Sequence, residues 1–302
     1  MRVVLALGGN ALLRRGDPLD AETQRRNVAD AVATAIAPIA RMHDVVITHG
    51  NGPQIGLLAL QAAADRATRP YPLDMLGAET QGLIGYLLES AIAAALPGRD
   101  VATVLTQVEV DPADPAFARP TKPIGPLYDE DAARRVEKMF DWPMMRDGNA
   151  WRRAAPSPEP KRIRELHIIQ LLLKAGVIVV CAGGGGIPVA AAADGSVRGV
   201  EAVIDKDLAT SLLAQTLEAD AMLFLTDVPG VFPRWPALGA GPLERTSVAW
   251  LRRRHFAPGS MGPKVEAACR FAEATGRWSA IGAVENAVAI LEGRSGTIIA
   301  PD

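Results

Sequence analysis

Short apolar runs rich in β-branched residues alternate with longer amphipathic segments along most of this chain. Continuous runs of this kind are typical of strands that are buried on both faces of a sheet. They lie at residues 2–7, 44–49, 101–108, 177–182, 221–226 and 296–300. Segments with helical periodicity lie near residues 79–95, 162–175, 206–218 and 263–275. The alternation predicts an α/β fold, a three-layer αβα sandwich in which helices cover both faces of a largely parallel central sheet and ligands bind at its carboxyl edge.

Composition places the chain among compact globular proteins. Hydrophobic residues make up 49% of its 302 residues and charged residues 22%, which is the usual balance for a packed domain. The formal net charge is -2 and the basic residues are scattered along the chain. We therefore expect neither a nucleic acid nor another polyanion as a partner.

Three further features predict a cytoplasmic protein without a membrane segment. Cys181 and Cys269 lie far apart and outside any metal-binding spacing, which is typical of a reducing compartment. Glycines after residue 7 interrupt the N-terminal apolar run too early for a secretory signal. The apolar stretch 166–182 contains charged and polar residues, and it falls short of the roughly 20 apolar residues of a membrane span.

The segment 111–160 departs from the alternation because it is rich in proline. Its prolines surround one charged helical patch, so the segment cannot form a regular strand-helix unit. It is either a linker or an excursion, and core-like sequence on both sides favours an excursion that protrudes over a site. We expect an N-terminal lobe at 1–165, with this small protruding subdomain at about 111–160, and a C-terminal lobe at 166–302.

Glycine-rich turns occur at residues 5–13, 47–56, 181–189 and 226–231. Three of them directly follow an apolar run, where backbone N–H groups converge on anions in many α/β proteins. Any one of these turns alone is more simply a strand-to-helix connection, whereas several on one sheet favour a phosphate site. The motifs GxxxxGK[ST] and GxGxxG are absent, so the phosphate site must use a different loop architecture.

Lysine is rare in this chain, and three lysines occupy constrained positions. Lys122 lies between prolines in PTKPIGP, Lys206 lies at an expected helix start in VIDKDLAT, and Lys264 follows a loop in GSMGPK. Each of them alone is more simply a solvated surface lysine. Together with Asp207 and the glycine turns they supply the cations, and the carboxylate that organises them, which phosphoryl transfer requires.

Eight segments, in chain order, resemble the carbamate kinases, a branch of the amino acid kinase family. They are LALGGNALL, HGNGPQIG, VATVLTQVEVDPADPAF, PTKPIGP, WRRAAPSPEP, GGGGIPV, GVEAVIDKDLA and HFAPGSMGPKVEAA. The resemblance implies the carbamate kinase-like fold, a homodimer, a role in arginine metabolism, and interconversion of ATP plus carbamate with ADP plus carbamoyl phosphate. It also implies that the N-terminal lobe binds carbamate or carbamoyl phosphate and that the C-terminal lobe binds the nucleotide.

The resemblance further implies roles for particular residues. Substrate contacts are implied for Gly8, Gly9, Asn10, Gly50, Asn51 and Gly52. Catalytic roles are implied for Lys122, Lys206, Asp207 and Lys264, and nucleotide contacts for Lys206, Thr226, Asp227, Met261 and Lys264. The implied mechanism is direct in-line transfer with Mg²⁺ carried by ATP or ADP and not by protein side chains. Because carbamoyl phosphate is a mixed anhydride, ATP synthesis is the chemically favoured direction.

Ala6 and His49 refine this hypothesis. Related acid kinases of the wider family carry a catalytic lysine where this chain has Ala6, and Lys122 would replace that charge. Transfer to an anionic carboxylate needs no general base, so we expect His49 only to shape its loop. Two alternatives stay open at this point: another acid kinase of the family, and a non-catalytic binding protein on the same scaffold.

Four consecutive glycines at 183–186 form the most unusual turn. Such backbone is costly to order, so the stretch must do something that side chains would prevent. We interpret Gly183 and Gly184 as close-approach backbone that lines the site of the phosphoryl group in transit. A flexible joint between the lobes is the competing interpretation.

Overall fold

The computed structural model describes residues 1–13, 16–64, 69–192, 194–233, 241–257 and 259–302. Its largest element is an eight-stranded sheet with the strand order β13-β15-β14-β12-β1-β2-β9-β3. The strands are β1 (Arg2–Leu7), β2 (Asp44–His49), β3 (Val101–Thr103), β9 (Ile178–Val180), β12 (Ala221–Thr226), β13 (Arg245–Ser247), β14 (Trp278–Ala283) and β15 (Thr297–Ala300). β14 and β15 pair antiparallel, and the other neighbours pair parallel. The predicted, largely parallel sheet is confirmed.

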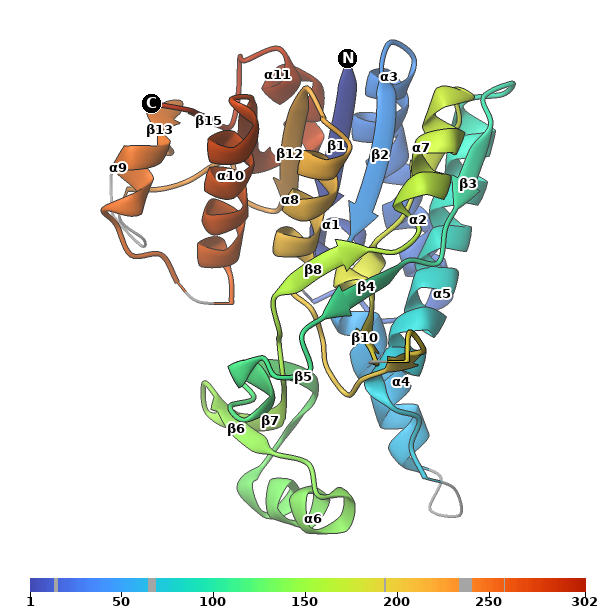
Figure 1. Ribbon diagram of the computed structural model, residues 1–302, viewed down its shortest axis with the longest axis vertical. Coiled ribbons are helices and arrows are strands. Elements are labelled where there is room, and N and C mark those ends of the chain that lie inside the picture. The colour runs from blue at the N-terminus through green and yellow to red at the C-terminus, as the bar shows by residue number, and fades with distance from the viewer. Residues whose placement is uncertain (14–15, 65–68, 193, 234–240, 258) are drawn as a thin grey trace.

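Helices cover both faces of this sheet (Figure 1). One face carries α2 (Ala21–Ala31), the π-helical segment η1 (Val32–Ile36), α3 (Ala37–Ala40), α5 (Leu73–Ala95) and α11 (Ala287–Leu291). The other face carries α7 (Leu166–Lys174), α8 (Lys206–Thr216), α9 (Val248–Arg252) and α10 (Met261–Thr275). The three predicted layers are therefore present. Among the described helices, none is long and apolar enough to cross a membrane.

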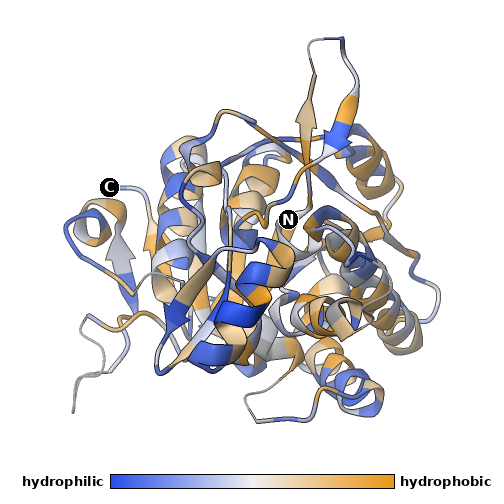
Figure 2. Ribbon diagram, turned by 90° about the horizontal axis from the view of Figure 1, so that it is seen from below, coloured by the Kyte–Doolittle hydropathy of each residue, from blue (hydrophilic) through white to orange (hydrophobic). Residues whose placement is uncertain are grey.

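The central strand β1 shows how the sheet divides the interior into two cores. Val3, Leu5 and Leu7 pack into the core beneath α2 and α5, whereas Val4 and Ala6 pack into the core beneath α8 and α10. All five side chains are fully buried, because alternate residues of a strand point to opposite faces and both faces are covered. Figure 2 shows the helices around this sheet with hydrophilic and hydrophobic residues interspersed along them, as expected of helices with one outer face.

The proline-rich segment forms the protruding subdomain at the lower end of Figure 1. It consists of β5 (Lys122–Tyr128), α6 (Glu130–Phe140), β6 (Met144–Asp147) and β7 (Ala150–Ala155), with the strand order β5-β7-β6. A four-stranded sheet of order β11-β10-β4-β8 lies at its base. Those strands are β4 (Gln107–Val110), β8 (Pro160–Ile163), β10 (Ile187–Ala191) and β11 (Val197–Gly199). The division into lobes at residue 165 stays a prediction. β9 belongs to the expected C-terminal lobe, but it lies between β2 and β3 of the expected N-terminal lobe in one continuous sheet.

The expected strand at 101–108 is wrong as a single element, because the chain leaves the central sheet after β3 and re-forms as β4. Side-chain hydrogen bonds replace the ladder at the break: Thr106 N–H donates to Gln81 Oε1 (2.8 Å), and Gln81 Nε2 donates to Thr106 O (3.2 Å). The expected helix at 162–175 likewise begins later, since residues 160–163 pair with β4 as β8. Sequence reasoning misses β14, in which Ser279 and Gly282 interrupt the apolar run.

Candidate active site

The carboxyl ends of β1, β2 and β12 point toward the protruding subdomain, and the glycine turns meet there (Figure 1). Gly8 N–H donates to Leu225 O (2.7 Å), and Gly50 N–H donates to Leu7 O (2.9 Å). A Cβ on Gly50 would lie 2.7 Å from the backbone nitrogen of Gly9, closer than real Cβ atoms approach. The turns after β1 and β2 therefore touch through bare backbone, which leaves no room for side chains between them.

The four glycines at 183–186 are each packed against a different part of the molecule. A Cβ would lie 2.2 Å from His49 Nε2 at Gly183, 2.2 Å from Asn51 Nδ2 at Gly184, 2.5 Å from Ile204 O at Gly185 and 2.2 Å from Val108 Cγ2 at Gly186. The last three glycines also have positive φ angles, of 66°, 97° and 91°, which favour glycine. Close packing on four sides favours the close-approach interpretation over a flexible joint.

The first turn of α8 and the first turn of α10 bring two of the three lysines together. Asp207 lies between them, with Oδ1 2.7 Å from Lys206 Nζ and Oδ2 2.9 Å from Lys264 Nζ. All three side chains are largely buried. The sequence-based expectation that a carboxylate organises these cations agrees with this geometry, although the catalytic roles stay predictions.

Burial and charge act against each other in this cluster. Burial alone would raise the pKa of Asp207, but the ammonium groups of Lys206 and Lys264 outweigh it and hold the pKa of that carboxyl well below its usual value. Burial lowers the pKa of Lys206, and Asp207 opposes that change. Within the described part of the chain, Lys206 Nζ and Asp207 Oδ1 form an ion pair but no well-aligned hydrogen bond. Asp207 is therefore ionised between the two ammonium groups.

Lys122 reaches this cluster from the base of the protruding subdomain. Its Nζ lies 3.1 Å from Asp205 Oδ2 and 3.3 Å from Ile204 O. Asp205 is the N-cap of α8, directly before Lys206 and Asp207. The structure therefore brings all three predicted lysines to the N-terminal ends of two neighbouring helices, where the helix dipoles add further positive potential.

His49 closes the end of β2 as a buried, uncharged residue. Burial lowers its pKa to about 4, and Nδ1 contacts Gly50 O at 3.1 Å, so that nitrogen carries the proton and donates it to the carbonyl. Its ring packs against Gly183. This environment agrees with the expectation that His49 shapes its loop.

Several supporting residues escape sequence reasoning because their partners are distant in the chain. Thr48 donates to Thr210 (2.7 Å), whose hydroxyl donates to Lys206 O (2.8 Å), and this links the end of β2 to the first turn of α8. Asn51 Nδ2 donates to Thr80 Oγ1 (2.8 Å), which fixes the direction of a predicted substrate contact. The sequence signal that could have indicated such a residue is a polar side chain inside an apolar helix pattern, such as Thr80 in α5.

A second ion pair holds the protruding subdomain on the core. Arg153 of β7 pairs with Glu201, whose other oxygen accepts a hydrogen bond from Leu73 N–H at the start of α5 (2.9 Å). The guanidinium of Arg153 also lies 4.0 Å from the ring centroid of Trp142. The side chain of Arg153 is buried, so this contact is better shielded from solvent than an exposed pair.

The remaining predicted residues lie around this centre. Thr226, at the end of β12, donates to Asp227 (3.1 Å) and lies next to the backbone of Gly8. Met261 begins α10 one turn before Lys264 and packs on the core. Gly52 begins α4 (Gly52–Ala64), and a Cβ there would meet open space. Asn10 belongs to α1 (Gly9–Leu12), but its side chain lies outside the described part of the structure.

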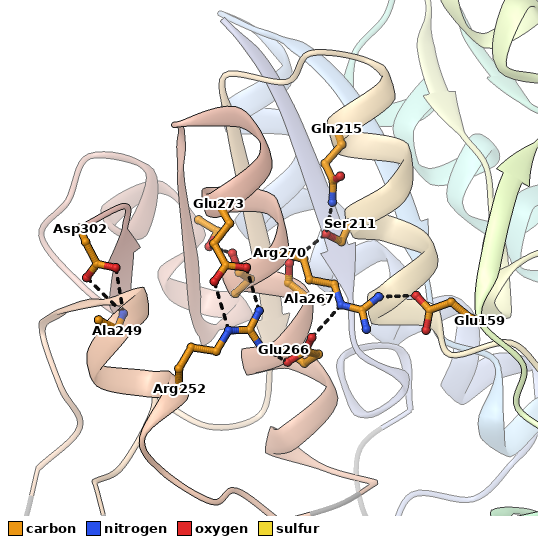
Figure 3. A network of polar contacts seen from close by, with 12 residues as sticks. Glu159, Ser211, Gln215, Ala249, Arg252, Glu266, Ala267, Arg270, Glu273 and Asp302 are labelled. Carbon is orange, nitrogen blue, oxygen red and sulfur yellow. Dashed lines mark hydrogen bonds and ion pairs between the residues drawn. The ribbon is translucent and has the colours of Figure 1, made fainter.

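A separate network of ion pairs links α9, α10 and the segment that returns from the subdomain (Figure 3). Arg270 pairs with Glu159 and with Glu266, and Arg252 pairs with Glu266 and Glu273. A cavity of about 400 Å³ lies beside it, and none of the predicted site residues line this cavity. The network is partly exposed, so we assign it a structural role of modest energy.

The fold and the lysine cluster define a phosphotransferase of the α/β sandwich class. A model of the amino acid kinase family matches residues 1–281, so the chain belongs to that family. The carbamate kinase of Rhizobium meliloti is 52% identical over 302 residues, covering 99% of this chain and 93% of the relative. The carbamate kinase of Pyrococcus furiosus is 46% identical and covers 99% of both chains.

Solved structures agree with the sequence relatives. The carbamate kinase from Giardia lamblia bound to AMP-PNP matches with a TM-score of 0.91 at 41% identity, covering 100% of this chain and 98% of that one. An N-acetylglutamate synthase from Neisseria gonorrhoeae matches with a TM-score of 0.60 at 15% identity, which shows only a shared fold. Sequence and structure thus point to the same branch of the family.

Proposed function

We propose that this protein is a carbamate kinase, which transfers a phosphoryl group reversibly between carbamoyl phosphate and ADP. The observation that carries the proposal is the Asp207 carboxylate, which pairs with both Lys206 and Lys264 beside closely packed glycine turns. A site with that charge pattern binds phosphoryl oxygens. The relatives named carbamate kinase, at up to 52% identity over nearly the whole chain, supply the identity of the acceptor.

Each group has a defined task in direct in-line transfer. The backbone N–H groups that follow Gly8 and Gly50 in their turns hold the carbamate end, since those of Gly8 and Gly50 themselves donate to Leu225 O and Leu7 O. Lys206 and Lys264 neutralise the phosphoryl oxygens, and Asp207 keeps both ammonium groups in place. Lys122 adds a third cation from the subdomain. Preorganised charges of this kind do not need to reorient during the reaction.

No general base takes part in this proposal. The acceptor oxygen of carbamate is already anionic, and His49 is a buried neutral residue whose Nδ1 proton is donated to Gly50 O. We therefore assign the rate acceleration to positioning and charge stabilisation.

The donor set fits phosphate oxygens and not a protein-bound metal. Within the described residues, no group of three or more His, Cys, Asp or Glu side chains is arranged to hold a metal ion. The carboxylates nearest the lysines, Asp205 and Asp207, are both engaged by ammonium groups. We propose that Mg²⁺ arrives with the nucleotide, where it would neutralise charge on the bridging phosphate oxygens.

We also propose that the protein acts as a homodimer. Exposed apolar side chains at one edge of the central sheet support this: Leu83 and Tyr86 on α5, and Ile168 and Leu171 on α7. They flank the edge strand β3, whose outer backbone groups have no neighbouring strand in the sheet order. An apolar surface next to an edge strand is typical of an interface with a second copy. Light scattering of the wild type and a Tyr86→Glu variant tests this: a dimer that dissociates in the variant is expected, and a monomeric wild type contradicts it.

A coupled assay for ATP tests the function itself. Purified protein is mixed with ADP and carbamoyl phosphate, with and without Mg²⁺, the reaction is stopped, and Mg²⁺ is added to both samples before the ATP formed is read through hexokinase and glucose-6-phosphate dehydrogenase. We expect ATP formation that depends on Mg²⁺, and little or none when acetyl phosphate replaces carbamoyl phosphate. Preference for another acyl phosphate would indicate a different acid kinase of the family. Binding of ADP without any turnover would indicate a non-catalytic protein.

A further inference from the structure

One carboxylate joins the protruding subdomain to the helix that carries two of the site residues. Asp205 Oδ1 accepts hydrogen bonds from the backbone N–H groups of Asp207 (2.9 Å) and Leu208 (3.3 Å), and so caps α8. Asp205 Oδ2 lies 3.1 Å from Lys122 Nζ. The two oxygens of a single side chain therefore contact two of the three elements that bring lysines to the site, β5 and α8.

The cap restricts where the second oxygen can point. Two hydrogen bonds to backbone N–H groups hold the carboxylate of an N-cap residue against its helix. Because Lys206 and Asp207 are the first two residues of α8, the direction of Asp205 Oδ2 is set relative to them. Lys122 thus takes its position from the same turn that presents Lys206.

The backbone around Asp205 strengthens this restriction. Ile204 O accepts a second contact from Lys122 Nζ at 3.3 Å. That carbonyl is packed against Gly185, where a Cβ would lie 2.5 Å away. The side chains of Lys122 and Asp205 are 27% and 23% exposed, so the pair is partly shielded from solvent. Lys122 is therefore held by two acceptors whose positions depend on the glycine segment and on α8.

We propose that Asp205 is a positioning residue for phosphoryl transfer: it aims Lys122 at the group held by Lys206 and Lys264. The inference rests on the proposed function, since it requires Lys122 to act during transfer. Attachment of the subdomain to the core is a separate function, because the ion pair of Arg153 and Glu201 holds β7 on the core through residues other than Lys122. The direction of the Lys122 side chain and the attachment of its subdomain to the core can therefore be tested independently.

A double-mutant cycle separates positioning from a purely structural role. Asp205→Asn keeps an oxygen to cap α8 but removes the charge that faces Lys122. We expect kcat to fall about tenfold with little change in the KM for ADP, and no further fall when Asp205→Asn is added to Lys122→Ala. An equal loss of kcat in both backgrounds would overturn the inference, because Asp205 would then act without Lys122.

Glu201→Gln is the matched control, since it weakens the other ion pair between the subdomain and the core. Glu201→Gln should change kcat by the same factor in the wild type and in the Lys122→Ala variant. If Glu201→Gln instead lowers kcat in the wild type but not in Lys122→Ala, as expected for Asp205→Asn, then Asp205 acts only by holding the subdomain on the core. The inference would then be wrong. Asp205→Ser, which can also cap α8, replaces Asp205→Asn if that variant does not fold.

Lysine acylation gives a readout that does not depend on turnover. Limited labelling with an N-hydroxysuccinimide acetate, followed by mass spectrometry, compares Lys122 with the exposed Lys161 in each variant. We expect Lys122 to label several-fold faster in Asp205→Asn while Lys161 is unchanged, and equal labelling of Lys122 would overturn the inference. If the wild type transfers no phosphoryl group while Lys122 labelling still changes, the proposed function fails and the contact with Asp205 stands.

Discussion

The ring of His49 lies against the backbone of Gly183 so closely that a Cβ on Gly183 would be 2.2 Å from His49 Nε2. The histidine is buried, and its other ring nitrogen donates to Gly50 O. A glycine and a histidine far apart in sequence thus form one packed unit at the ends of β9 and β2. This unit keeps the histidine neutral and places bare backbone beside the site.

Stability should fall on acidification because His49 is buried without charge. Burial lowers the pKa of His49 from 6.5 to about 4, although its hydrogen bond to Gly50 opposes the change. The unfolded chain binds a proton below about pH 6.5 and the folded protein does not until about pH 4, so this contribution is complete above that window and is lost within it. Denaturant titrations should show a loss of about 2 kcal/mol in the free energy of unfolding between about pH 7 and about pH 5.

The variant His49→Phe provides the control for this pH dependence. Phenylalanine keeps a ring against Gly183 but cannot be protonated. Its free energy of unfolding should therefore change less than that of the wild type over the same interval. An equally steep loss in His49→Phe would assign the pH dependence to other groups.

Gly184→Ala should reduce turnover more than nucleotide affinity. The residue has a φ of 66°, and its new Cβ would lie 2.2 Å from Asn51 Nδ2, so Asn51 must leave its position beside Thr80. We expect kcat to fall by at least about tenfold, which corresponds to about 1.4 kcal/mol of transition-state stabilisation, with a nearly unchanged KM for ADP. The reverse pattern would contradict the placement of this glycine beside the transferred group.

Gly82→Ala is the matched control for that substitution. Gly82 lies within α5, and a Cβ there would meet no atom within 4 Å. Alanine is favoured over glycine in a helix by roughly 0.5–1 kcal/mol, so this variant should be at least as stable as the wild type. Its turnover should be unchanged once light scattering shows the oligomeric state of the wild type, because Gly82 lies beside Leu83 and one turn from Tyr86 on the proposed dimer surface.

Asp207→Asn should impair turnover and leave the fold intact. The substitution removes the charge that holds Lys206 and Lys264, whereas the N-cap of α8 belongs to Asp205 and is retained. We expect kcat to fall by about 10²–10³, the usual effect of losing one preorganised electrostatic group. Circular dichroism checks the fold, and Glu273→Gln, which breaks a pair on the same helix as Lys264 but outside the site, serves as the control. A misfolded Asp207→Asn variant would favour a structural role.

Lys122→Ala should lower kcat by a similar factor of about 10²–10³. The side chain supplies the third cation of the site, and Ala6 leaves β1 without a lysine that could substitute for it. Steady-state kinetics in the direction of ATP synthesis measure the effect, with the exposed Lys161→Ala as the control. Near-normal turnover in Lys122→Ala would remove this lysine from the mechanism.

Thiol reagents should not modify the folded protein. Cys181 and Cys269 are both buried, and burial raises the pKa of each thiol, to about 11 for Cys269. Since the thiolate is the reactive form, Ellman's reagent should detect no thiol in the native protein and both thiols after denaturation. Rapid modification of the native protein would show that one of these cysteines becomes exposed in solution.

The arrangement of the sheet follows from local patterns that the sequence displays directly. Residues 2–7 and 221–226 are continuous apolar runs because both faces of their strands are covered, and any strand in that environment must have such a sequence. The three lysines stand out by their rarity and by their place beside prolines or helix starts. Local signals therefore indicate the fold class, the protruding segment and the charges of the site.

Contacts between distant residues were decided by the tertiary structure alone. Nothing in the run 101–108 shows that Gln81 will bind Thr106 and divide the strand. Likewise, the sequence indicates that four adjacent glycines must avoid side chains, but the neighbours they avoid include His49 and Ile204, which become neighbours only when the chain has folded. Periodicity and composition report the environment of each residue, whereas the sharing of Asp205 between α8 and Lys122 depends on how separate elements are placed in space.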